Sequence, residues 1–147
     1  MTATAPQAGA VLALDPGSVR VGVAVSTPGS PLATPVGSLS RGSPDFWPRL
    51  SREVNDRGVA RILVGLPRQL DGSEGEAAVA ARAFAAEVER RTGIGCQLWD
   101  ERFSTAQAER ELIAAGARRR QRRKRVDAVA ATLLLQSWLD SPRSQGR

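Results

Sequence analysis

Short apolar runs and turn residues alternate in the first third of the chain. The apolar run at residues 11–14 ends at Asp15, and the turn dipeptide Pro-Gly follows at 16–17. Valine then alternates with small or polar residues over 19–25, which is the period of a strand. A third, weaker strand is predicted over 33–39. Together these segments predict an antiparallel meander.

Helical and strand patterns alternate over the rest of the chain. Two capping-box patterns, Ser73 with Glu76 and Ser104 with Gln107, predict helix starts. The predicted elements are, in order, a helix over 44–56, a strand over 61–66, a helix from 73 to about 91, a strand over 97–100, a helix over 104–116 and a last helix over 126–139. The complete order is therefore β-β-β-α-β-α-β-α-α.

This order predicts an α/β fold with a five-stranded mixed sheet and helices on both faces. A chain of 147 residues suits one domain with a modest core, which we expect to span residues 8–140. Residues 1–7 and 141–147 are expected to be disordered tails.

A run of cations at residues 118–125, the basic run, accounts for the net charge of +6. It contains seven of the 21 lysines and arginines and no acid, whereas the rest of the chain holds all 15 acids and is close to neutral. Seven like charges repel unless a partner neutralises them, so the run predicts a contact with the phosphates of a nucleic acid. A solvated helix end is the alternative. The candidate nucleic-acid-binding residues are Arg118, Arg119, Arg120, Arg122, Arg123, Lys124 and Arg125, together with Arg20 and Arg102.

Several classes of protein and site are excluded by residue usage. Cys96 is the one cysteine, so no intrachain disulfide can form. The absence of histidine excludes histidine general bases and histidine zinc sites, so any metal must bind oxygen ligands, which favours magnesium or manganese. The first residues do not resemble a signal peptide, and no apolar run is long enough to cross a membrane. We expect a soluble, cytoplasmic protein without a membrane partner.

Two candidate acids follow predicted strands. Asp15 ends the first strand, where a carboxylate can project from the rim of a sheet, although Asp before Pro-Gly is also a common turn starter. Glu101 follows the fifth strand, and Asp100 beside it points to the opposite face if the strand stays regular. On pattern alone the choice between Asp100 and Glu101 stays open.

A third acid, Asp127, opens the apolar stripe of the last helix. The positions that share its helix face are Ala130, Ala131, Leu134 and Trp138. A charge on a core-facing stripe is costly unless it is paired or binds metal. Two other interpretations remain: Asp127 caps the helix N-terminus, or it pairs with Arg123 or Arg125.

Phosphodiester hydrolysis is a reaction in which three such acids would converge. Two magnesium or manganese ions about 4 Å apart can hold the attacking water and the leaving oxygen, and nearby cations can stabilise the phosphate charge. A loop after the fourth strand, residues 65–67 with 71–75, leads to a helix N-terminus and could also receive phosphate. An ordinary loop and helix cap is an equally good interpretation of that segment.

Four motifs in order resemble a known family. They are Ala-Leu-Asp-Pro-Gly-Ser-Val-Arg-Val-Gly-Val-Ala-Val-Ser at 13–26, Val-Gly-Leu-Pro at 64–67 with Asp-Gly-Ser at 71–73, Asp-Glu-Arg-Phe-Ser-Thr at 100–105, and Val-Asp-Ala-Val-Ala-Ala at 126–131. The chain resembles the YqgF/RuvX family over residues 11–139. The resemblance implies an RNase H-like fold, a metal-dependent nuclease site made of Asp15, Glu101 and Asp127, and therefore Glu101 rather than Asp100. It also implies maturation of the 5′ end of pre-16S ribosomal RNA, Holliday-junction resolution, or both.

The leading hypothesis is thus a magnesium- or manganese-dependent endonuclease that acts on structured RNA or branched DNA. A non-catalytic RNA- or junction-binding module is the second hypothesis. Phosphate contacts carry affinity but little sequence information, so the cations do not distinguish DNA from RNA. A homodimer would suit a resolvase that cuts two strands symmetrically.

Overall fold

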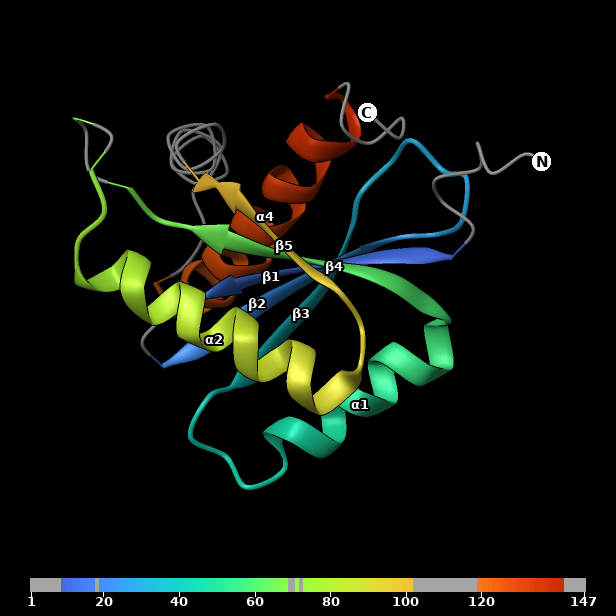
Figure 1. Ribbon diagram of the computed structural model, residues 1–147, viewed down its shortest axis with the longest axis horizontal. Helices are drawn as coiled ribbons and strands as arrows, with labels where there is room; N and C mark the ends of the chain where they lie inside the picture. Colours follow the sequence, from blue (N-terminus) through green and yellow to red (C-terminus); the bar gives the residue numbers. More distant parts are fainter. Residues whose placement is uncertain (1–8, 18, 69–70, 72, 102–118, 142–147) are drawn as a thin grey trace.

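The computed structural model describes residues 9–17, 19–68, 71, 73–101 and 119–141, with the backbone alone for 119–127. Its sheet has the strand order β3-β2-β1-β4-β5 (Figure 1). β1 pairs antiparallel with β2 and β2 with β3, whereas β4 is parallel to β1 and β5 is parallel to β4. The strands are β1 (Ala10–Pro16), β2 (Arg20–Ser26), β3 (Thr34–Ser40), β4 (Val59–Leu66) and β5 (Cys96–Asp100). The predicted meander and mixed five-stranded sheet are confirmed.

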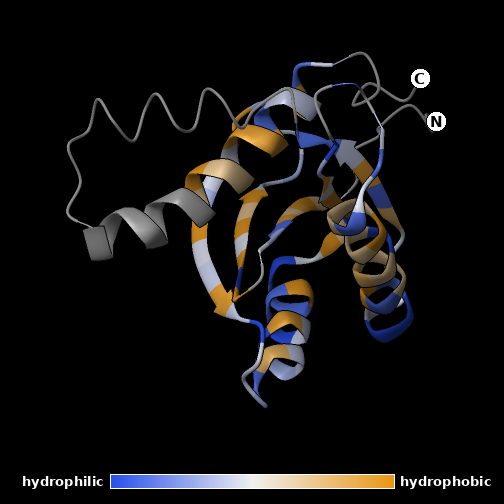
Figure 2. Ribbon diagram, turned by 90° about the vertical axis from the view of Figure 1, so that its left-hand side faces the viewer, coloured by the Kyte–Doolittle hydropathy of each residue, from blue (hydrophilic) through white to orange (hydrophobic). Residues whose placement is uncertain are grey.

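Helices cover both faces of the sheet, as predicted. α1 (Phe46–Arg57) and α2 (Glu76–Thr92) lie on one face, and α4 (Arg119–Leu139) crosses the other face over β1, β2 and β3 (Figure 1). The sheet and the part of α4 that packs on it are largely hydrophobic (Figure 2). Each face therefore has its own apolar core.

Alternation along β1 assigns its side chains to the two cores. Leu12 and Leu14 pack beneath α1 and α2, whereas Val11 and Ala13 pack beneath α4. Asp15 continues the second series. The sheet therefore presents Asp15 on the face that α4 covers, at the end of the strand.

The helix over Arg119–Leu139 begins earlier than predicted. The sequence interpretation started it near Val126 and left the basic run outside, but residues 119–125 are helical. Arg, Lys and Gln are good helix formers and the run contains neither Gly nor Pro, so nothing local stops the helix from extending. The predicted apolar stripe is largely confirmed: Ala131, Leu134 and Trp138 are buried, and Ala130 is half-buried.

The start of α2 also differs from prediction. The helix begins at Glu76 with Gly75 as its N-cap and no side-chain capping bond. The Ser73 hydroxyl donates instead to Asp71 at 2.6 Å, a local side-chain bond that competes with helix capping. The predicted Ser73–Glu76 capping box is therefore wrong, and Ser73 belongs to the loop.

Some predictions fall on residues outside the described part of the chain. These are the helix over 104–116, Arg102, Arg118 and nearly all of the two tails. In the residues that are described, no helix is both long and apolar enough to cross a membrane.

Candidate active site

The parallel strands β1, β4 and β5 end at one edge of the sheet, and two of the candidate acids lie there. Asp15 is near the end of β1, and Glu101 directly follows β5. The register pairs Leu14 with Val64 across β1 and β4, and Leu66 with Asp100 across β4 and β5. The two acids are thus carried by strands on either side of β4.

A glycine in β4 leaves the space through which these acids meet. A Cβ atom on Gly65 would lie 2.6 Å from Oε2 of Glu101 and 3.0 Å from its Cγ. The Glu101 side chain therefore lies directly on the backbone of β4, in a volume that any other residue at position 65 would fill. The sequence places Gly65 in the predicted strand over 61–66 and at the start of a candidate phosphate loop. Its close contact with Glu101 could not be predicted, because it depends on strand pairing.

The Glu101 side chain is hydrogen-bonded to Asp15. Burial, the charge of Asp15, a hydrogen bond with Asp15 and the charge of Asp100 together raise the pKa of Glu101 to about 9. Two carboxylates in one partly buried site cannot both carry a charge cheaply, so the pair keeps a proton near neutral pH. A divalent cation would replace that proton and satisfy both groups. The two carboxylates offer the oxygen donors that suit magnesium or manganese.

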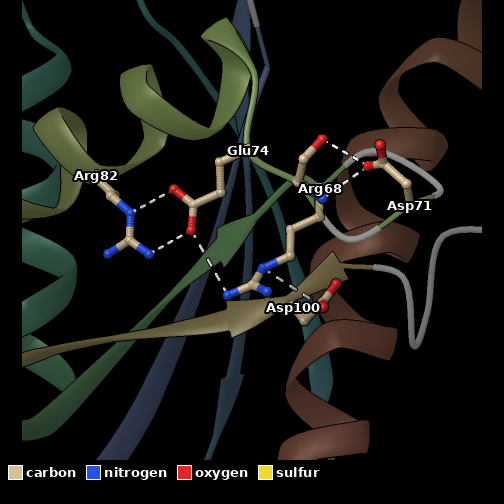
Figure 3. A network of polar contacts seen from close by, with 6 residues as sticks. Arg68, Asp71, Glu74, Arg82 and Asp100 are labelled. Carbon is tan, nitrogen blue, oxygen red and sulfur yellow. Dashed lines mark hydrogen bonds and ion pairs between the residues drawn. The ribbon is translucent and has the colours of Figure 1, made fainter.

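Asp100 and Glu101 lie on opposite faces of the sheet. The indole of Trp99 donates to Ser137 of α4 at 2.7 Å, so Trp99 is on the α4 face. Asp100 is on the α2 face, where Arg68 contacts it (Figure 3). Glu101 then returns to the α4 face beside Asp15. The expected alternation is confirmed, and of the two acids it is Glu101 that meets Asp15.

Asp127 lies in α4, one helical turn before the buried residue Ala131. Its side chain is outside the described part of the structure, so its place in the site stays a prediction. Among the described side chains, no group of three or more Asp, Glu or Cys residues could hold a metal ion. The described portion of the site is therefore the Asp15–Glu101 pair.

The turn after Asp15 is held by backbone and side-chain contacts. The Gly17 N–H donates to the carbonyl of Arg20 at 2.8 Å, and a Cβ on Gly17 would lie 2.8 Å from the same oxygen. Arg41, which follows β3, donates from Nη1 to the Gly17 carbonyl at 2.8 Å and lies over the Phe84 ring. Sequence reasoning missed Arg41, because only strand pairing brings it to this turn.

The described candidate cations come from two elements, β2 and α4. Arg20 begins β2 and is half-buried, opposite Ser40 of β3. The other described cations of the predicted run, whose backbone lies in α4, are Arg119, Arg120, Arg122, Arg123, Lys124 and Arg125. Their contact with nucleic acid stays a prediction.

The loop between β4 and α2 carries its own charge pairs. Arg82 of α2 donates to Glu74 from Nε at 2.8 Å and from Nη2 at 2.6 Å. Glu74 therefore supplies a negative charge next to the N-terminus of α2, where a phosphate was considered. Of the two interpretations of this segment, the described contacts favour an ordinary loop.

The chain matches one family model and several named proteins over most of its length. A family model described as "RuvX: Holliday junction resolvase" matches residues 9–141. A protein of Acidiphilium cryptum named "Putative pre-16S rRNA nuclease" is 40% identical over 141 residues, covering 95% of this chain and 89% of its own. A protein of the same name from Nocardia farcinica is 42% identical over 147 residues, covering 94% of this chain and 81% of its own.

A solved structure shares the fold. T. thermophilus RuvC in complex with a Holliday junction substrate superposes with a TM-score of 0.52 at 17% identity, covering 86% of this chain and 91% of that one. At this identity the similarity concerns the fold alone, which is the RNase H-like fold of RuvC.

Proposed function

The chain belongs to the RuvX family, and from this we propose that it is a metal-dependent endonuclease that hydrolyses phosphodiester bonds in structured nucleic acid. The observation that carries the proposal is the contact between Asp15 and Glu101 over Gly65. Two ionised acids that share a partly buried site destabilise one another unless a proton or a metal cation lies between them. Such a pair does little to stabilise the fold, but its carboxylate oxygens can bind a metal ion.

The proposed ligands are Asp15, Glu101 and Asp127. Carboxylate oxygens are the ligands that magnesium and manganese prefer. When bound, these ions supply positive charge that activates a water molecule and neutralises phosphate oxygens. The chain contributes two acids on a rigid sheet edge and a third on the helix that packs over it, so we propose a site for two ions.

The proposed nucleic-acid contacts are the cations around these acids. Residues 119–125 of the basic run lie in the same helix as Asp127. A nucleic-acid backbone bound by the run would therefore pass close to the third proposed ligand. The members of this set are Arg118, Arg119, Arg120, Arg122, Arg123, Lys124, Arg125, Arg20 and Arg102. Neutralising one of them should weaken binding and reduce its salt dependence without changing sequence preference.

Precursor 16S ribosomal RNA is the first proposed substrate, because the curated relatives are named for it. A four-way DNA junction is the second, because the description of the matching family names it. RNA has a 2′-hydroxyl that DNA lacks, and the two helices differ in shape. The cleavage rates of one protein preparation on both substrates can therefore be compared.

The deciding experiment compares wild type with Asp15→Asn and Glu101→Gln on a precursor 16S RNA fragment and a four-way DNA junction, with Mg²⁺ or Mn²⁺. We expect wild type to cleave at least one substrate and both variants to lose roughly a hundredfold or more in rate while still binding. Asp56→Asn, an exposed acid at the far end of α1, is the matched control. Full cleavage by Asp15→Asn would overturn the proposal, and binding without cleavage of either substrate by wild type would favour the non-catalytic module.

A further inference from the structure

Four charged side chains of alternating sign form a chain on the α2 face of the sheet (Figure 3). Arg82 of α2 binds Glu74 through two hydrogen bonds. Nη2 of Arg68 lies 3.6 Å from Oε2 of Glu74, and Nε of Arg68 lies 3.8 Å from Oδ2 of Asp100. This charge chain connects α2, the loop after β4 and the last residue of β5.

The contacts at the two ends of the charge chain differ in length. Arg82 and Glu74 make short paired contacts, whereas both contacts of Arg68 are longer than a hydrogen bond. Asp100, at the other end, has a side chain only 14% exposed, compared with 34% for Arg68. A carboxylate that is so little exposed depends on a nearby cation, and Arg68 supplies one.

Asp100 also directly precedes Glu101 in the chain. Asp100 pairs with Leu66 in the last register position of β4 and β5. Glu101 then lies against Gly65 with its Oε2 2.6 Å from the Cβ position. In so close a fit, a small rotation of the backbone at Asp100 would move the Glu101 carboxylate away from Asp15.

We propose that Arg68, through its ion pairs with Asp100 and Glu74, is a positioning residue for Glu101. Its ion pairs hold the end of β5 next to the loop after β4. They thereby set the direction of the backbone at Glu101, which follows the strand. It also balances the charge of Asp100 on the face opposite the metal site. The inference rests on the proposed nuclease function, in which Glu101 is a metal ligand.

The first test replaces Arg68 and measures metal binding as well as cleavage. For Arg68→Gln we expect roughly tenfold weaker Mn²⁺ binding by calorimetric titration, in line with the loss of other residues that orient metal ligands. We expect kcat to fall by a similar factor while KM for the nucleic acid stays within twofold. Arg68→Lys, which keeps the charge, should recover part of both losses.

Arg57→Gln is the matched control. Arg57 pairs with Glu53 at 2.5 Å on α1, with side-chain exposures of 38% and 31%, similar to the 34% and 28% of Arg68 and Glu74. That pair lies near Gly58, at the sheet edge opposite the acids. Wild-type metal binding in Arg57→Gln supports the proposal. An equal loss in Arg57→Gln would overturn it, because the effect would then be general destabilisation.

A double-mutant cycle with Asp100→Asn tests whether the ion pair is the functional unit. If Arg68 acts through Asp100, the double variant should bind Mn²⁺ about as tightly as the single variant with the lower Mn²⁺ affinity. Additive losses would overturn the proposal. A rise in KM with unchanged Mn²⁺ binding would also overturn it, because Arg68 would then contact substrate directly.

These results separate the inference from the function on which it rests. Wild type that cleaves, with Mn²⁺ binding unchanged in Arg68→Gln, refutes the positioning role alone. Wild type that cleaves neither substrate, with Mn²⁺ binding weakened in Arg68→Gln, refutes the nuclease and supports the positioning role.

Discussion

The carboxylate of Glu101 rests on the backbone of Gly65, 2.6 Å from the point where a Cβ atom would be. This contact crosses from the end of β5 to β4 and brings Glu101 to Asp15 on β1. A side chain at position 65 would fill the volume that the Glu101 carboxylate occupies. The glycine therefore allows Glu101 to lie in this place beside Asp15.

Gly65→Ala should displace Glu101 and impair the site more than the fold. Oε2, Cγ and the carboxyl carbon of Glu101 all lie within 3.1 Å of the new methyl group, so the whole side chain must move. We expect Mn²⁺ affinity and cleavage rate to fall about tenfold or more, with about 1–3 kcal/mol lost in the free energy of unfolding. Gly42→Ala is the control, because nothing lies within 4 Å of its Cβ position. Wild-type affinity in Gly65→Ala would contradict this prediction.

The stability of the metal-free protein should fall as the pH rises. The pKa of Glu101 is raised from 4.5 to about 9 by burial and by the charge of Asp15. Between these values the unfolded chain releases a proton that the folded chain keeps, so each pH unit in the window costs up to about 1.4 kcal/mol of folding free energy. Below pH 4.5 Glu101 is protonated in both states, so its contribution to the slope disappears.

Urea unfolding in EDTA at pH 5 to 9 measures this slope. Glu101→Gln cannot ionise and should flatten the curve, and Mg²⁺ should do the same for wild type because it replaces the shared proton. Glu74 and Glu87 have pKa values lowered by arginine partners, so their contributions are lost only as the pH falls into the acid range. Equal slopes for wild type and Glu101→Gln would refute the shared proton.

Arg41→Gln should loosen the turn that follows Asp15. The variant loses the bond to the Gly17 carbonyl and the contact with the Phe84 ring, whose centroid lies 4.9 Å from the guanidinium carbon. We expect a cost of about 1–2 kcal/mol in unfolding free energy and a lower kcat, because Asp15 lies at the start of that turn. Thermal unfolding and single-turnover cleavage measure the two effects.

Arg91→Gln is a useful companion to that variant. Arg91 lies 4.6 Å from the Trp47 ring centroid and contacts no residue of the turn among the interactions described. It should lose stability without losing kcat. A similar loss of kcat in both variants would show that Arg41 acts through stability rather than through the turn.

The single thiol should be unreactive in the folded protein. Burial, and then the charge of Glu89, raise the pKa of Cys96 from 9.0 to about 11. At pH 8 the thiolate is therefore roughly a hundredfold scarcer than in the unfolded chain. Ellman's reagent should react slowly with native protein and rapidly in urea, and Glu89→Gln should accelerate the native reaction. A native rate within a few-fold of the rate in urea would contradict the prediction.

Local patterns were sufficient for most of the fold. Alternating valines in β2, the four-residue spacing of Phe46, Leu50 and Val54 in α1, and the apolar stripe at the end of α4 each depend on residues close in sequence. The same patterns put Asp15 and Glu101 at strand ends and Asp100 on the other face. The prediction of a capping box at Ser73 was wrong because two local signals competed there. Ser73 binds Asp71 instead of capping α2.

Contacts across the sheet required the tertiary structure. No local pattern relates Gly65 to Glu101, Arg41 to Gly17 or Arg68 to Asp100, because each pair is joined by strand register or loop packing between distant segments. The sequence by itself determined which acids could reach the rim of the sheet, since alternation along a strand is a local property. Only the tertiary structure decided that Glu101 meets Asp15 over Gly65, since a close approach depends on which strands pair and in what register.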